Sequence, residues 1–358
     1  MILHIFNPEH DMALAANDPF WTAPHAGRQM RADLGWIPAL WASDNDLVLV
    51  DNKEKAEFSS KKTSHSNPNV YYVELKDITS NSNLAASINK IMPWGWDVNI
   101  RAQLLRSGIN ECCVPDNEHM AAIRELSGRA TAARLLSSLC VTSQLLHGEA
   151  IPCNTFGDVV ARITDYSQAV LKTPWSCSGR GVRYVRDIDK NTERWICKTL
   201  EKQGYIMVEP YYDKVKDFGM EFTSFADGTV RYEGLSLFRT LNGTYVGSVL
   251  ATEDEKRSML TKYIPKDLLD SICRYICDWM SREINGQYVG PFGVDMMIIK
   301  THSGLKVNPC VEINLRRTMG HVALSLSPTT REQQCLMNIG YDGNSYHMRI
   351  INDHELLY

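Results

Sequence analysis

Two acidic residues and an amide are spaced so that a β-hairpin would bring their oxygens to one face. Residues 294–300 and 305–313 are mainly apolar and strand-like, and residues 301–304 between them are typical of a hairpin turn. If residue 300 faces about residue 306, Asp295 lies across from about residue 311, next to Glu312. Asn314 lies two residues beyond Glu312 and therefore on the same face.

This arrangement predicts a metal site. Cross-strand Cβ atoms lie about 4.5–5.5 Å apart, and two carboxylates at that distance repel unless a cation or a shared proton separates them. Two carboxylates and an amide oxygen suit magnesium, which completes its shell with water and phosphate oxygens. The alternative is that Asp295 and Glu312 are solvated surface charges. Their apolar flanks, Met-Met-Ile-Ile after Asp295 and Val311 and Ile313 around Glu312, favour the metal site.

A second group of residues could bind phosphate. Lys172 ends an apolar strand-like stretch and is followed by a loop of small residues: Ser176, Ser178, Gly179 and Gly181. Small residues let backbone amides converge on an anion, and the lysine adds a positive charge. The segment lacks the P-loop motif, the third glycine of the Rossmann fingerprint and the kinase order of loop and lysine. A plain hairpin turn remains the alternative.

A third segment, Met-Val-Glu209-Pro-Tyr211, is an apolar strand that stops at a proline. Free backbone groups at such a strand end could recognise an adenine through its donors and acceptors. A simple exit from strand to loop is the alternative.

Composition limits the class of protein. The 358 residues (40.6 kDa) contain 44% hydrophobic and 22% charged residues, which is typical of globular domains. A net charge of −4 and a pI of 6.2 argue against nucleic acid as the main partner. No run approaches the roughly 18 apolar residues of a membrane span, and the first residues lack the features of a secretion signal. The ten cysteines show no C-x-x-C pair, and without a secretion signal we expect reduced thiols in a cytoplasmic protein.

The elements that would carry these groups alternate between strands and helices. Near the N-terminus, residues 1–6, 47–51 and 70–75 are strand-like, which indicates a small α/β domain. We expect one helix over 119–138, from its three- and four-residue apolar spacing, and a mostly helical segment over 319–339. The remaining strands are expected at 169–172, 181–185, 204–211, 219–225, 229–238 and 245–250.

The order of the three groups, Lys172 with its glycine loop, then Glu209, then Asp295, Glu312 and Asn314, resembles the ATP-grasp superfamily. Glu312-Ile-Asn314-Leu-Arg316 resembles that family's E-x-N-x-R signature. The resemblance covers residues 129–317, about half of the chain.

The resemblance implies a fold of class α/β plus α+β. A Rossmann-like domain of the kind that precedes ATP-grasp modules would occupy residues 1–117. The small ATP-grasp subdomain with the glycine-rich loop would occupy 118–206, and the subdomain with the metal site would occupy 207–358.

The resemblance also implies roles for single residues. Lys172 and the 176–181 loop would contact the phosphates of ATP, and Glu209 and Tyr211 would hold adenine. Asp217 or Lys216 could reach the ribose. Two magnesium ions would be held by Asp295, Glu312 and Asn314, and Arg316 would stabilise the transferring phosphoryl group. Further phosphate contacts are expected from Arg129, which stands where the family often has a lysine, and from Arg239.

The implied activity is an ATP-dependent ligase that activates a carboxylate as an acyl phosphate for attack by an amine or a thiol. A nucleotide-binding module without turnover and an ATP-dependent phosphotransferase remain the alternatives. Substrate contacts are expected from Arg317 and from Asn7, Glu9 and His10, which directly follow the first strand; turn chemistry explains Asn7-Pro8 equally well. We expect small-molecule acid and amine substrates and a homodimer.

Overall fold

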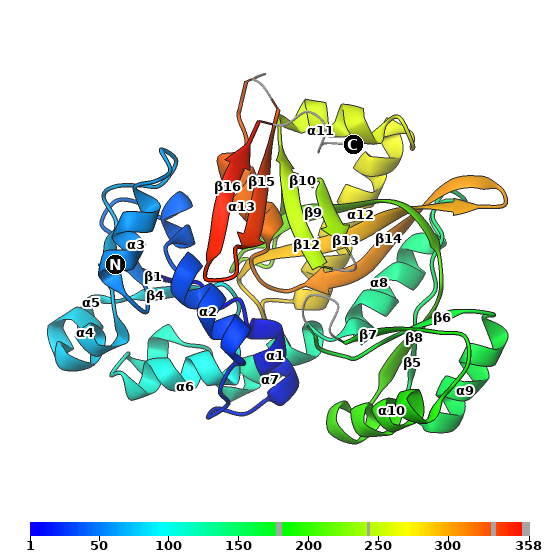
Figure 1. Ribbon diagram of the computed structural model, residues 1–358, viewed down its shortest axis with the longest axis horizontal. Coiled ribbons are helices and arrows are strands. Elements are labelled where there is room, and N and C mark those ends of the chain that lie inside the picture. The colour runs from blue at the N-terminus through cyan, green and yellow to red at the C-terminus, as the bar shows by residue number, and fades with distance from the viewer. Residues whose placement is uncertain (177–180, 242–243, 331–333, 353–358) are drawn as a thin grey trace. The chain divides into compact units, whose positions relative to one another are not determined.

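The chain divides into two compact units that interleave along the sequence. The computed structural model describes residues 1–352 except 177–180, 242–243 and 331–333 (Figure 1). Unit 1 comprises Met1–Arg124, Val246–Thr252 and the residues from Leu315 onward. Unit 2 comprises Glu125–Tyr245 and Glu253–Asn314. This division differs from the three consecutive segments predicted above, because residues 246–252 and those after 314 group with the N-terminal residues.

Unit 1 contains a parallel sheet in the order β3-β2-β1-β4. Its strands are β1 (Ile2–Ile5), β2 (Leu47–Leu49), β3 (Tyr71–Val73) and β4 (Lys90–Pro93). The first three were predicted, and β4 was not. Its helices are α1 (His10–Ala16), α2 (His25–Leu34), α3 (Lys53–Ser60), α4 (Leu75–Ser80), α5 (Ser82–Ser87), α6 (Val98–Arg106) and α13 (Met319–Leu326), with two short 3-10 helices, η1 (Ile37–Leu40) and η2 (Glu111–Cys113).

Strands at the far end of the sequence form a second sheet in unit 1. Residues Gly247–Leu250 of β12 (Thr244–Leu250) pair antiparallel with β15 (Cys335–Tyr341), which pairs with β16 (Tyr346–Ile351). The prediction of a mostly helical 319–339 was therefore wrong beyond α13. One partner of β15, the strand β12, is distant in sequence, and local patterns do not reveal it.

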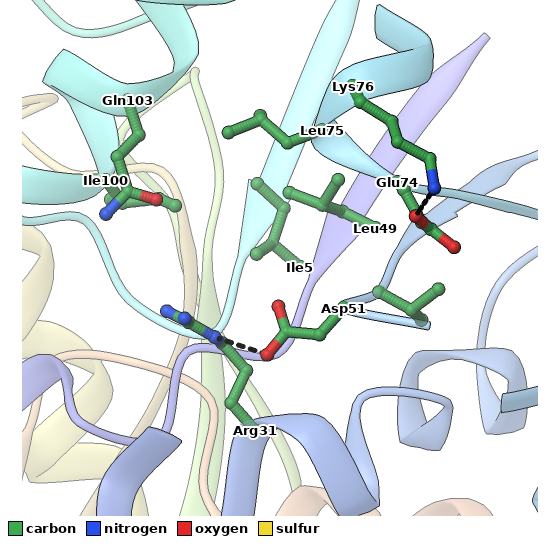
Figure 2. Close-up of a pocket in the computed structure, with 10 residues that line it drawn as sticks. Ile5, Arg31, Leu49, Asp51, Glu74, Leu75, Lys76, Ile100 and Gln103 are labelled. Atoms are coloured by element: carbon green, nitrogen blue, oxygen red, sulfur yellow. Dashed lines mark hydrogen bonds and ion pairs between the residues drawn. The ribbon is translucent and has the colours of Figure 1, made fainter. Parts of the chain in front are cut away.

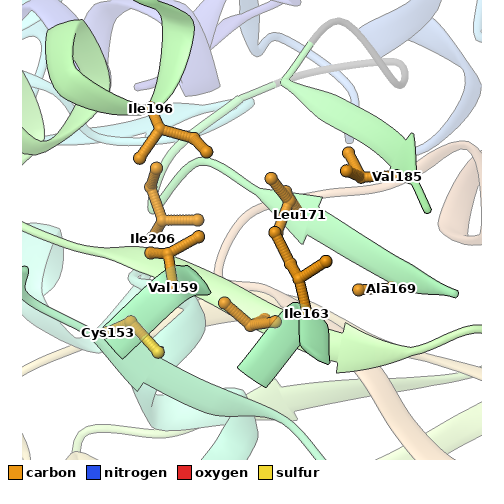
Figure 3. Packing of buried hydrophobic residues seen from close by; sticks show 9 residues of the cluster. Cys153, Val159, Ile163, Ala169, Leu171, Val185, Ile196 and Ile206 are labelled. Atoms are coloured by element: carbon orange, nitrogen blue, oxygen red, sulfur yellow. The ribbon is translucent and has the colours of Figure 1, made fainter. Parts of the chain in front are cut away.

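The first sheet of unit 2 is antiparallel in the order β5-β8-β6-β7. It consists of β5 (Ile151–Cys153), β6 (Ala169–Lys172), β7 (Val182–Val185) and β8 (Ile206–Pro210). Helices α9 (Phe156–Asp165) and α10 (Lys190–Gln203) pack on it (Figure 1). Their apolar residues, including Val159 and Ile196, meet Leu171 and Ile206 of the sheet in a core that excludes water (Figure 3).

The second sheet of unit 2 has the order β10-β9-β13-β14, and all its pairs are antiparallel. Its strands are β9 (Asp213–Ser224), β10 (Val230–Ser236), β13 (Gly290–Thr301) and β14 (Gly304–Asn314). Helices α11 (Glu253–Leu260) and α12 (Lys266–Ile284) contact β10, and α8 (Arg129–Cys140) contacts β14. The short β11 (Phe238–Leu241) contacts β9. The parallel sheet of unit 1 and the antiparallel sheets of unit 2 confirm the predicted combination of α/β and α+β structure.

The helix expected over 119–138 is two helices. The first, α7, spans Asn117–Leu126. The helical conformation is interrupted at Ser127 and Gly128, and α8 begins at Arg129. Gly128 has extended backbone angles (φ −71°, ψ 145°), and a Cβ there would lie 3.0 Å from the hydroxyl of Tyr205. The break places Arg129 in the first turn of a helix that packs on the strand carrying Glu312.

Among the residues that the structure describes, no helix has both the length and the apolar character needed to cross a membrane.

Candidate functional site

The predicted pairing of the two carboxylates is confirmed by the register of β13 and β14. Asp295 lies directly opposite Glu312, and Gly293 lies opposite Asn314. Near the turn, Lys300 pairs with Leu305, but the register shifts between Asp295 and Met297. The irregularity adds two residues on β14, so that Glu312 rather than Cys310 lies across from Asp295.

The amide joins the same group. Asn314 Nδ2 donates a 2.9 Å hydrogen bond to Asp295 Oδ2, so the three predicted ligands lie together as expected. On the other side of β13, Gly219 of β9 pairs with Asp295, and a Cβ at Gly219 would lie 3.3 Å from Asp295 Oδ1. No cluster of three or more His, Cys, Asp or Glu side chains arranged to hold a metal occurs among the described residues. A divalent ion here would therefore need water or phosphate oxygens to complete its shell.

A buried arginine holds Glu312. One Nη of Arg129 lies 2.9 Å from Glu312 Oε1, and Arg129 Nε donates to the carbonyl oxygen of Thr173 at 2.9 Å. Arg129 is only 7% exposed. The guanidinium therefore connects the carboxylate pair to the chain just after Lys172, a link that sequence spacing did not indicate. It also shows that this face accommodates a positive charge beside Glu312.

Lys172 and Glu209 form a second buried ion pair. Lys172 ends β6, Glu209 lies on the neighbouring strand β8, and Lys172 Nζ lies 2.7 Å from Glu209 Oε2. Their side chains are only 8% and 9% exposed. The carboxylate of Glu209, which was expected near adenine, is occupied by the lysine in this conformation.

The base of the glycine-rich loop is tightly packed. Thr173 N donates to the carbonyl oxygen of Gly181 at 2.9 Å, and a Cβ at Gly181 would lie only 2.2 Å from Thr173 Oγ1. Glycine is therefore required at 181. The hydroxyl of Ser176 accepts a 3.4 Å hydrogen bond from Arg129. Ser178 and Gly179 lie outside the described residues, so their expected phosphate contacts stay predictions.

One buried thiol lies near both the Asp295–Glu312 pair and the Lys172–Glu209 pair. Cys310 of β14 is 2% exposed, and burial raises the pKa of its thiol well above the ordinary value. The charges of Asp295, Lys172, Glu209 and Glu312 also act on that pKa, the three carboxylates raising it and the lysine lowering it. The carboxylate pair and the Lys172–Glu209 pair therefore both act on the thiol of Cys310, and all these residues belong to unit 2.

The position of Cys310 gives a direct test of this packing. We expect iodoacetamide to modify exposed Cys112 and Cys197 in the native protein and to leave Cys310 unmodified, because the thiolate is the reactive form and burial suppresses it. Peptide mass spectrometry before and after unfolding measures the difference. Modification of native Cys310 as fast as that of Cys112 would contradict the packed arrangement.

The other residues expected to contact nucleotide lie on β8, β9 and β11. The backbone N–H of Tyr211 donates to the carbonyl oxygen of Gln168 at 2.9 Å, so this amide does not offer adenine a donor in this conformation. Asp217 accepts hydrogen bonds from Lys214 Nζ (2.5 Å) and Thr240 Oγ1 (2.8 Å).

Arg239 belongs to a cationic group. Burial lowers the pKa of Lys216, and the positive charges of Lys262 and Arg239 lower it further. Neighbouring positive charges suit an anionic ligand, and the expected phosphate contact of Arg239 stays a prediction.

In unit 1, the residues after β1 are tied to those after β4. Asn7 Nδ2 donates to the carbonyl oxygen of Gly95 (2.9 Å) and to Asp97 Oδ2 (3.2 Å), and His10 Nδ1 contacts the same carboxylate at 3.3 Å. A Cβ at Gly95 would lie 2.5 Å from the His10 ring. Asn7 and His10 are 3% and 1% exposed, so their burial favours a structural role over the predicted substrate contact.

The remaining predicted residues of unit 1 also contact other side chains. Glu9 Oε1 lies 2.6 Å from Arg31 Nη1. Burial raises the pKa of Glu9, and the charge of Arg31 opposes that shift. Arg316 Nη2 lies 2.8 Å from Asp11 Oδ2, and the guanidinium of Arg317 lies 4.2 Å from the centre of the Trp41 ring. The expected roles of Arg316 in phosphoryl transfer and of Arg317 in substrate binding stay predictions.

Comparison with known proteins gives no match to a family model or to a curated protein. Solved structures do match. N5-carboxyaminoimidazole synthetase from Staphylococcus aureus, complexed with ADP, has a TM-score of 0.52 at 14% identity, covering 96% of this chain and 83% of that chain.

N5-carboxyaminoimidazole ribonucleotide synthetase from Thermus thermophilus has a TM-score of 0.50 at 14% identity, with coverage of 95% and 83%. The biotin carboxylase domain of the 2-oxoglutarate carboxylase from Hydrogenobacter thermophilus, in complex with MgADP, ADP and bicarbonate, has a TM-score of 0.54 at 12% identity, with coverage of 94% and 74%. At these identities the likeness concerns the fold.

Proposed function

We propose that the chain, which has the fold of these solved structures and the motifs that resemble the ATP-grasp superfamily, is an ATP- and magnesium-dependent ligase that joins a carboxylate to an amine or a thiol. The observation that carries the proposal is the placement of Asp295 opposite Glu312, with Asn314 hydrogen-bonded to Asp295. A module that only binds nucleotide has no need of two carboxylates facing each other across neighbouring strands.

In this proposal, Asp295, Glu312 and Asn314 would hold magnesium, and the resemblance implies two ions. Bound there, magnesium would neutralise charge on the β- and γ-phosphate oxygens. The residues fit a hard cation because their donors are oxygens. Arg129 now pairs with Glu312, so this carboxylate would have to be shared between Arg129 and the ion.

The chain itself supplies two further cations. Lys172 is fixed by Glu209, and Arg129 is fixed by Glu312 and by the carbonyl oxygen of Thr173. A cation whose position is fixed before the substrate arrives stabilises developing negative charge without reorganisation. We assign both to phosphate binding, with Ser176 and the rest of the 176–181 loop beside them.

The proposed reaction needs no nucleophile from the protein. A carboxylate oxygen of the acid substrate forms a bond to the γ-phosphorus as the bond to the β-phosphate oxygen breaks, which gives an acyl phosphate and ADP. The amine nitrogen then bonds to the acyl carbon, phosphate leaves with the bonding electron pair, and the amine loses a proton to solvent. Positioning and charge neutralisation are the main requirements of phosphoryl transfer.

The test is ADP release from the full chain with ATP, magnesium and pooled small-molecule acids and amines. We expect release that requires both an acid and a nucleophile, with an amide or thioester as product. A single acceptor with a stable phosphorylated product would identify a phosphotransferase instead. ATP affinity without turnover on any pool would leave only the binding module. The proposal includes the expected cytoplasmic location and the expected homodimer. Analytical ultracentrifugation of the full chain measures the oligomeric state.

A further inference from the structure

Unit 1 contains a cavity at the carboxyl ends of three parallel strands. It has a volume of about 390 Å³ and is lined by Ile5 at the end of β1, by Leu49 at the end of β2 and the two residues that follow it, and by Glu74 to Lys76 after β3 (Figure 2). Arg31 of α2 and Ile100 and Gln103 of α6 complete it. Volumes of roughly 300–1,000 Å³ are typical of small-molecule sites, and ligands of open α/β sheets bind at this edge.

The structure explains why the space lies on this side of the sheet. In the order β3-β2-β1-β4, the strand order reverses at β1, and its neighbour there is β4. The segments that follow β1 and β4 are joined to each other, because Asn7 and His10 contact Gly95 and Asp97. The ends of β1, β2 and β3 therefore offer the open part of this edge.

The cavity is apolar in the middle and charged at its rim. Ile5, Leu49 and Leu75 lie together between two ion pairs (Figure 2). One pair joins Arg31 Nε to Asp51 Oδ2 at 3.5 Å, and the other joins Lys76 Nζ to Glu74 Oε2 at 2.6 Å. The rim has two positive and two negative groups, so it complements a ligand that carries both signs.

The first pair is the better suited to exchange partners. Arg31 is held in place by Glu9 at 2.6 Å, whereas its contact with Asp51 is long, and the Asp51 side chain is 44% exposed. A fixed guanidinium beside a loosely held carboxylate presents opposite charges a few ångströms apart. An α-amino acid presents its carboxylate and its ammonium at a similar spacing.

We propose that this cavity binds an α-amino acid with an apolar side chain. Its carboxylate contacts Arg31, its ammonium contacts Asp51, and its side chain packs on Ile5, Leu49 and Leu75. The further claim that this amino acid is a substrate, as either the acid or the amine, rests on the ligase function proposed above. The claim that the cavity binds it does not.

The experiment measures binding to the full chain without nucleotide by isothermal titration calorimetry, with leucine as the probe. The comparison compounds are 4-methylpentanoate, which lacks the ammonium, and isopentylamine, which lacks the carboxylate. We expect both to bind at least about tenfold more weakly than leucine, because each loses one charge-assisted contact. Equal binding of leucine and 4-methylpentanoate would overturn the proposal.

Variants test the position. Asp51→Asn is expected to weaken leucine binding about tenfold and to leave 4-methylpentanoate binding unchanged. Leu75→Trp, at the partly exposed start of α4, fills the cavity and is expected to abolish binding without changing its charges. Glu57→Gln, on the exposed face of α3, is the control and is expected to bind as the wild type does. Wild-type affinity in both cavity variants would overturn the assignment.

The two proposals fail separately. Leucine binding without ADP release on any pool would support the cavity and reject the ligase. Turnover that leaves leucine unbound would support the ligase and reject the cavity assignment.

Discussion

Replacing Glu312 with glutamine is expected to lower ATP- and magnesium-dependent turnover by about a hundredfold or more, while the chain stays folded. The substitution keeps the shape of the side chain and removes the negative charge that would bind the metal opposite Asp295. It also removes the counterion of Arg129, whose Nε still donates to the carbonyl oxygen of Thr173. Losses of about 10²–10³ in rate follow when a single preorganised electrostatic contact to a transition state is removed. ADP release over a magnesium titration measures the loss, and circular dichroism checks the fold.

A matched control is available in the same sheet. Glu233→Gln makes the identical chemical change on an exposed position of β10, and wild-type turnover is expected there. Wild-type turnover in Glu312→Gln at every magnesium concentration would reject the assignment of the metal site.

The second large effect concerns the buried pair of Lys172 and Glu209. Lys172→Met is expected to destabilise the protein by about 3–5 kcal/mol, because it leaves the carboxylate of Glu209 buried without its counterion. Adding Glu209→Gln to Lys172→Met removes that unpaired charge and is expected to restore most of the stability. Urea unfolding of the wild type, the two single variants and the double variant gives the coupling energy between the two side chains.

Nucleotide binding separates the two roles of Lys172. If the lysine also contacts phosphate, the double variant regains stability and still binds ATP weakly. Lys198→Met, on the exposed side of α10, controls for the loss of a lysine and is expected to leave both properties unchanged. A double variant as unstable as Lys172→Met alone would show that the ion pair is not the source of the effect.

The sequence permits prediction of the carboxylate pair because a hairpin turn fixes register. Once the turn at 301–304 is recognised, alternation brings Asp295 near Glu312, and the structure bears this out. The register irregularity that makes them direct partners was not predicted. It depends on how β14 packs, and the turn alone does not determine that.

Contacts between distant segments were beyond such reasoning. Arg129 was expected to meet phosphate, but nothing in its local pattern indicated the ion pair with Glu312. The strand β15 has the same limitation, because one of its partners, β12, lies much earlier in the chain, although the other, β16, follows it directly. The burial of Asn7 and His10 could not be predicted from the sequence either. It depends on the loop after β4, a strand that the sequence did not reveal.

The interleaving of the two units has a consequence for synthesis on the ribosome. Tyr346 N donates a 2.8 Å hydrogen bond to Asp33 Oδ2, so α2, made early, is completed by a strand made near the end of translation. The emerging N-terminal segment must wait for that strand, with part of its surface uncovered in the meantime. Shortened gene fragments that stop after β14 are therefore expected to yield an incomplete first unit, whereas a circularly permuted gene joining the late strands to the early helices would release them together.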